Sequence, residues 1–173
     1  METVELKLAL KESMMSCTEP SFVYVTFIET TAEKLWLALI DGDFTERYWF
    51  GYRVTSDWKP GSSYRFAGHD GQSVEGKVLT FDPPRRLAYS WDSCAPDIKE
   101  RPSRVTFDIE PLGNAVKLTV VHDGFEEGSP TLRNISGGWP RVLSSLKTLL
   151  ETGHTLKLEP PVAARKENTH AQA

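Results

Sequence analysis

The sequence predicts an α+β fold in which an antiparallel sheet packs against one long C-terminal helix. Apolar residues recur at helical spacing from Trp139 to Leu150, which makes a stripe wide enough to be buried. Segments that precede this helix alternate polar and apolar residues between regularly spaced turns. This pattern is typical of antiparallel strands that have one face exposed to solvent. Because the helix and the sheet each have one apolar face, the helix is expected to lie across the sheet.

The first strand is expected at residues 22–29, which are rich in β-branched and aromatic side chains. Thr30 and Glu33 have the spacing of a capping box, so a helix should begin there and end near Asp41. A second short helical turn is expected at about residues 44–48. The remaining strands are predicted near residues 51–57, 62–67, 73–81, 86–92, 103–110 and 115–122.

The long C-terminal helix is expected to begin after Gly137-Gly138, where two glycines let the chain turn sharply. Pro140 suits the first turn of such a helix, because its missing N–H costs nothing there. Residues 131–136 then form a separate helical turn that the glycines end. A phosphate-binding role for the glycines is disfavoured, since no Lys-Ser/Thr pair follows them and no parallel strand precedes them.

A chain of 173 residues fits one domain with a sizeable core. We predict a leader segment at residues 1–20, the folded domain at residues 21–158 and a flexible tail at residues 159–173. In the leader, the alternation from Val4 to Leu10 fits a strand and also fits a helix, and both alternatives stay open.

Bulk composition excludes several classes of protein. The net charge is −4 with acids and bases interspersed, which argues against nucleic-acid binding. No apolar run approaches the roughly 20 residues needed to span a bilayer. The acidic start differs from a secretory signal, so a cytoplasmic location is expected. Cys17 and Cys94 lack metal-site spacing and are expected to be free thiols.

His122 has the strand parity of Val116, Leu118 and Val120, so its side chain should point to the apolar side of the sheet. It is either a polar contact or proton shuttle in a cavity, or a histidine held by hydrogen bonds at the strand end. No Ser, Cys or carboxylate stands beside it in a motif, so no catalytic residue is predicted.

Other titratable groups favour structural roles. The remaining histidines lack zinc-site spacing, and no metal site is expected; they are His69, His154 and His170. The carboxylates cluster at element ends, where caps and solvated turns are usual; they are Asp41, Asp43 and Glu46, then Asp92, Asp97 and Glu100. Glu75 has the strand parity of a residue facing water.

Five segments, in order, resemble the domain called activator of heat-shock protein 90 ATPase homologue, C-terminal type, of the START-like (SRPBCC, Bet v 1-like) superfamily. The most similar segment has the Gly-x-Val, Asp-Pro-Pro and aromatic-x-Trp pattern of the family. Together the segments cover about residues 21–152; they are residues 31–39, 58–66, 75–91, 104–107 with 116–125, and 138–147. Ser62 and Pro140 depart from the family pattern.

The resemblance implies a helix-grip fold: a seven-stranded antiparallel sheet wrapped around a long C-terminal helix, with two short helices between strands one and two. A strongly bent sheet that closes over one helix is also expected to leave a hollow between sheet and helix. The residues expected to line it are Trp36, Tyr64, Arg65, Phe66, Trp91, Phe107, His122, Trp139, Leu143 and Leu146.

The expected function is non-catalytic binding of a small apolar or amphipathic molecule, with no cofactor, by a monomer or homodimer. One alternative is a co-chaperone-like protein that stimulates a chaperone ATPase through its surface. The other is a cyclase or hydrolase acting in the hollow, which would need a second inward acid or base beside His122.

Overall fold

The computed structural model describes residues 19–93 and 99–158. Most of the predicted leader, the predicted tail and both cysteines lie outside these residues. Within the described part, no helix is both long and apolar enough to cross a membrane.

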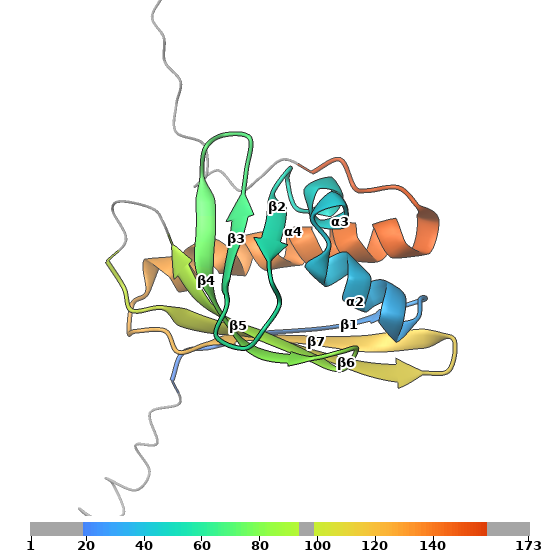
Figure 1. Cartoon of the computed structure of the whole chain (residues 1–173), viewed down its shortest axis with the longest axis horizontal. Coiled ribbons are helices and arrows are strands. Elements are labelled where there is room, and N and C mark those ends of the chain that lie inside the picture. The colour runs from blue at the N-terminus through green and yellow to red at the C-terminus, as the bar shows by residue number, and fades with distance from the viewer. Residues whose placement is uncertain (1–18, 94–98, 159–173) are drawn as a thin grey trace, which may run out of the picture.

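Seven strands and three helices make up the described part of the chain (Figure 1). They are β1 (Phe22–Ile28), α2 (Ala32–Ile40), α3 (Gly42–Tyr48), β2 (Arg53–Ser56), β3 (Ser63–Ala67), β4 (Ser73–Asp82), β5 (Arg86–Ser93), β6 (Ser103–Leu112), β7 (Ala115–Asp123) and α4 (Pro130–Thr152). The order of elements is the one that the alternating pattern and the resemblance predict.

All seven strands form one antiparallel sheet in the order β1-β7-β6-β5-β4-β3-β2. The long helix α4 runs across this sheet, and α2 and α3 lie at one end of it (Figure 1). This arrangement confirms the helix-grip fold. One face of the sheet therefore meets α4, and the other faces solvent.

The pairing of β4 with β5 is irregular at one point. The pairing register shifts between Val78 and Thr80, which is the signature of a bulge. Nearby, a Cβ on Gly76 would lie 2.0 Å from the carbonyl oxygen of Ser90. Only glycine therefore allows the backbones of β4 and β5 to approach this closely at residue 76. Together, the bulge and the close approach help curve the sheet around the helix.

The buried core lies between the inner face of the sheet and α4. On β7, Val116, Leu118, Val120 and His122 are all buried, as their shared parity predicts. The apolar stripe of α4 meets them; its buried members are Ile135, Trp139, Val142, Leu143, Leu146 and Leu149.

The predicted start of the long helix was wrong by about two turns. Helix α4 begins at Pro130, and the hydroxyl of Ser129 caps it by accepting a hydrogen bond from the Leu132 N–H at 3.0 Å. Residues 131–136, the two glycines and Pro140 therefore all lie inside one helix. Burial of Ile135 and Trp139 on the same stripe outweighs the local preferences of glycine and proline for helix ends.

The cap of α2 also differs from the prediction by one residue. Thr31, not Thr30, accepts the hydrogen bond from the Lys34 N–H, at 3.3 Å. At the other end of α2, the Asp41 carboxylate accepts hydrogen bonds from the N–H groups of Asp43 and Phe44 at 2.8 and 3.1 Å. Asp41 thus ends α2 and caps α3, the structural role expected for this carboxylate.

Candidate functional site

Trp139, near the middle of α4, lies at the centre of an aromatic cluster between helix and sheet. Its ring lies 5.2 Å from Trp49, 5.7 Å from Trp91 and 5.8 Å from Phe107, measured between centroids. Trp49 also packs on Phe66 at 4.4 Å. These distances are those of rings in direct contact, so several aromatic side chains pack against one another in the region where the sequence predicted a hollow.

A chain of hydrogen bonds runs through this cluster. The indole N–H of Trp139 donates to Nδ1 of His122 at 3.1 Å. The other ring nitrogen, Nε2, lies 2.7 Å from the hydroxyl oxygen of Ser103. Because Nδ1 is an acceptor, the neutral ring must carry its proton on Nε2 and donate it to Ser103.

His122 is fully buried and neutral. Burial lowers its pKa from 6.5 to about 3, although the negative charge of Asp123 acts in the opposite direction. With Nδ1 accepting from Trp139 and Nε2 protonated, the ring has no free lone pair with which to take a proton from Ser103. The pair therefore lacks the arrangement of a nucleophile and its base.

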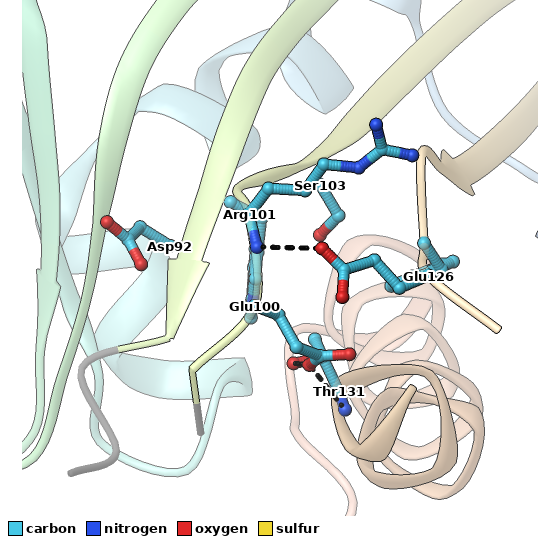
Figure 2. A pocket seen from close by; sticks show the side chains of 8 residues that line it. Asp92, Glu100, Arg101, Ser103, Glu126 and Thr131 are labelled. Carbon is cyan, nitrogen blue, oxygen red and sulfur yellow. Dashed lines mark hydrogen bonds between the residues drawn. The ribbon is translucent and has the colours of Figure 1, made fainter. Parts of the chain in front are cut away.

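Ser103 connects this chain to a small pocket between the ends of β5 and β6 and the start of α4 (Figure 2). The pocket volume is about 10 Å³, room for roughly one water molecule. Since the Ser103 oxygen accepts from His122, its own hydrogen can be donated to a molecule in the pocket. The lining residues are Trp91, Asp92, Glu100, Arg101, Ser103, Phe125, Glu126 and Thr131.

Glu100 closes the pocket beside the first turn of α4. One carboxylate oxygen accepts hydrogen bonds from the Thr131 backbone N–H at 3.1 Å and from the Thr131 hydroxyl. Burial raises the pKa of Glu100. Hydrogen bonds from Ser129 and Thr131 and the charge of Arg133 have a larger effect in the opposite direction, so the pKa of Glu100 lies below its usual value. The second oxygen is buried and has no partner among the described residues.

The structure brings together eight of the ten residues predicted to line the hollow. They are Tyr64, Phe66, Trp91, Phe107, His122, Trp139, Leu143 and Leu146. Trp36 is also buried, but its ring contact is with Phe81, at 5.1 Å, in a separate aromatic group that includes Trp58.

Arg65 does not belong to the site. It stands between the inward-pointing Tyr64 and Phe66 on β3, so its side chain points outward, where it pairs with Glu75 at 3.1 Å. Strand alternation contradicts its assignment as a polar contact in the interior. The outward position of Glu75 is confirmed.

Three residues of the site lie outside the set predicted from the sequence. Trp49 follows the short helix α3, where no periodic pattern indicated its direction. Ser103 shares the inward parity of Val105 and Phe107 on β6, so alternation could have found it. Phe125 packs on His122, 4.5 Å between ring centroids, from beyond the end of β7.

One of the other histidines has an acidic partner. His69 is exposed and lies 2.9 Å from the carboxylate of Glu46. No group of three or more His, Cys, Asp or Glu residues in the described part of the chain is placed to hold a metal ion.

Comparison with known proteins supports the fold. The family model described as Activator of Hsp90 ATPase homolog 1-like protein matches residues 29–151. A protein from Mesorhizobium loti is 25% identical with a TM-score of 0.68, over 76% of this chain and 96% of that one. No curated protein matches the sequence.

Two further solved structures share the fold at lower identity. The Aha1 dimer from Colwellia psychrerythraea is 20% identical with a TM-score of 0.67, over 78% of this chain and 98% of that one. An HSP90 activator from Plasmodium falciparum is 21% identical with a TM-score of 0.64, over 75% of this chain and 95% of that one.

Proposed function

The chain belongs to the Activator of Hsp90 ATPase homolog 1-like family, and we propose that it is a non-catalytic binding protein for a small, largely apolar molecule that carries one polar oxygen. The supporting observation is the hydrogen-bond chain from Trp139 through His122 to Ser103. It sets a single hydroxyl at the border between an aromatic cluster and a pocket. Ligand sites typically combine apolar walls with a few placed polar groups.

Binding of anything larger than water requires a ring to move. Trp91 is the candidate, because it lines the pocket, packs on His122 at 5.4 Å and is only partly buried. A flat ligand can take the place of the Trp91 ring against Trp139 while its oxygen accepts the hydrogen bond from Ser103. His122 then acts as a positioning residue, since it holds the Ser103 hydroxyl in this orientation.

The test compares p-cresol with toluene, two probes of similar shape that differ by one hydroxyl. Binding is followed through the tryptophan indole N–H signals in ¹H–¹⁵N NMR spectra. We expect p-cresol to bind several-fold more tightly, and Ser103→Ala to remove this difference. Ser136→Ala, an exposed serine of α4, is the matched control and should keep it. If neither probe shifts the indole signals at millimolar concentration, the proposal is wrong.

A second candidate function is stimulation of a chaperone ATPase. It is favoured by the family match and by the similarity to the HSP90 activator from Plasmodium falciparum. Close packing of the rings is compatible with action through the surface instead of through a cavity. The measurement is the ATPase rate of a purified Hsp90-type chaperone with saturating protein. A rise in rate that Ser103→Ala leaves unchanged supports this function, and an unchanged rate excludes it for that chaperone.

A further inference from the structure

The sheet has two edge strands, and one of them is well protected. At β2, the backbone N–H of Val54 donates to the Thr45 hydroxyl of α3 at 3.0 Å. Arg53 on the same strand pairs with the carboxylates of Asp43 and Glu46. A short strand, a charged side chain and a covering helix are the usual ways in which proteins prevent an edge from pairing with another strand.

The other edge strand, β1, is protected at one end only. There, Lys147 of α4 donates to the carbonyl oxygen of Phe27 at 2.7 Å, and the Glu29 N–H donates to the Glu151 carboxylate at 2.9 Å. Backbone groups point to alternate sides of a strand. The N–H and C=O groups of Val23 and Val25 therefore face the same side as those of Phe27, where no strand of the described residues lies.

The side chains of β1 add an apolar surface to this open edge. Val23, Val25 and Phe27 point to the outer face and are 57%, 48% and 56% exposed. Residues Phe22–Ile28 include no charged residue and no proline. Such an edge is expected to be covered by another segment.

We propose that residues 4–10 of this chain pair with the open half of β1 as an additional antiparallel strand. The chain reaches β1 at its open end, where residues 19–21 precede Phe22, and eighteen further residues stand before them in the sequence. Their alternation of Val4, Leu6, Leu8 and Leu10 suits a strand. Residues 11–21 lie between the two segments and are long enough to make the return connection.

Tethering favours this segment over a second copy of the chain. A segment joined by a short connection has an effective concentration on the order of millimolar at its site. A second copy at micromolar concentration competes at a disadvantage of about a thousandfold for the same backbone groups. The Lys147 and Glu151 contacts limit pairing to the half of β1 nearest to the entering chain.

The test is amide hydrogen exchange of the full chain, resolved by residue. Pairing protects the N–H groups of Val23 and Val25, which face the open side. Tyr24 and Thr26 face β7 and serve as internal controls, protected in every variant. The variant Lys7→Pro/Leu8→Pro blocks pairing. In a paired strand, one of two consecutive residues donates its backbone N–H to β1, and proline has no N–H to donate. Ser13→Pro, in the connection, is the matched control.

We expect at least tenfold faster exchange of Val23 and Val25 in the double-proline variant, with Ser13→Pro unchanged. Equal exchange in the wild type and the double-proline variant overturns the proposal. Protection that increases between 5 and 200 µM protein also overturns it, because it identifies a second copy as the occupant.

Discussion

The two faces of the sheet satisfy their polar side chains in opposite ways. On the outer face, ion pairs span neighbouring strands while remaining in contact with water; they are Arg65–Glu75, Arg86–Asp108, Arg104–Asp123 and Lys117–Glu110. On the inner face, the polar groups of Trp139, His122 and Ser103 are buried, uncharged and linked in one hydrogen-bond chain.

Two consecutive residues of β6 show both arrangements, a buried hydrogen bond on the inner face and an exposed ion pair on the outer face. Ser103 points inward to His122, and Arg104 points outward to Asp123 at 2.8 Å. Water can replace a lost partner on the outer face but not on the inner one. The same number of hydrogen bonds therefore stabilises the two faces unequally, because the cost of an unpaired polar group depends on its burial.

The largest effect is expected for His122→Leu. It leaves the buried indole N–H of Trp139 without an acceptor and the Ser103 hydroxyl without its donor. We expect a loss of about 2–4 kcal/mol in the free energy of unfolding. Urea denaturation measures this loss. A loss below about 1 kcal/mol would mean that water reaches these groups and that the inner face resembles the outer one.

The free energy of unfolding should depend on pH through the buried His122 of the inner face. In the unfolded chain His122 binds a proton near its ordinary pKa of 6.5, whereas in the folded protein its pKa is about 3. Protons therefore favour the unfolded state between these values. The contribution of neutral His122 is complete above pH 6.5 and decreases by up to about 1.4 kcal/mol per pH unit as pH falls toward 3.

The pH-dependent contribution of His122 is measured as the difference in unfolding free energy between the wild type and His122→Leu. The carboxylates titrate in both proteins, so their contribution cancels in this difference. We expect the difference to shrink from pH 7 to pH 4. A constant difference over this range would contradict a buried, neutral imidazole.

Ser103→Ala should have a smaller effect, about 1–2 kcal/mol of lost stability, because it removes only the acceptor of the His122 Nε2 proton. Thermal unfolding followed by circular dichroism is the measurement. Ser136→Ala on the exposed side of α4 is the comparison variant and should change stability much less. Equal effects of the two substitutions would argue against a special role for the inner serine.

The smallest effect is expected on the outer face. Arg86→Gln removes an exposed ion pair with Asp108, which should cost about 0–1 kcal/mol and should cost less still in 1 M salt. Denaturation at low and high salt checks this. A loss as large as that of His122→Leu would remove the distinction between the faces.

Sequence patterns predicted the sheet well because strand alternation is a local property. The parity of Val116, Leu118 and Val120 placed His122 inward, and the structure confirms it. The same rule, applied to Tyr64 and Phe66, would have placed Arg65 outward; assigning it to the interior ignored the alternation.

Local sequence patterns could not predict the start of α4 or the hydrogen-bond partners of His122. Gly137 and Pro140 favour helix ends, yet burial of the stripe that includes Trp139 keeps both inside the helix. Trp49 joins the aromatic cluster from a turn without periodicity. Such contacts join residues far apart in the chain, and no spacing in the sequence records them.

Periodicity in the sequence was enough to predict the α+β class, the order of the elements and the inward direction of residues such as Val116 and His122, because two- and 3.6-residue periods follow from backbone geometry alone. Only the tertiary structure decided that Trp139, His122 and Ser103 form one hydrogen-bond chain, and that one edge of the sheet is covered while half of the other is open. These features depend on how α3 and α4 pack against the curved sheet, and packing selects among partners that are distant in sequence.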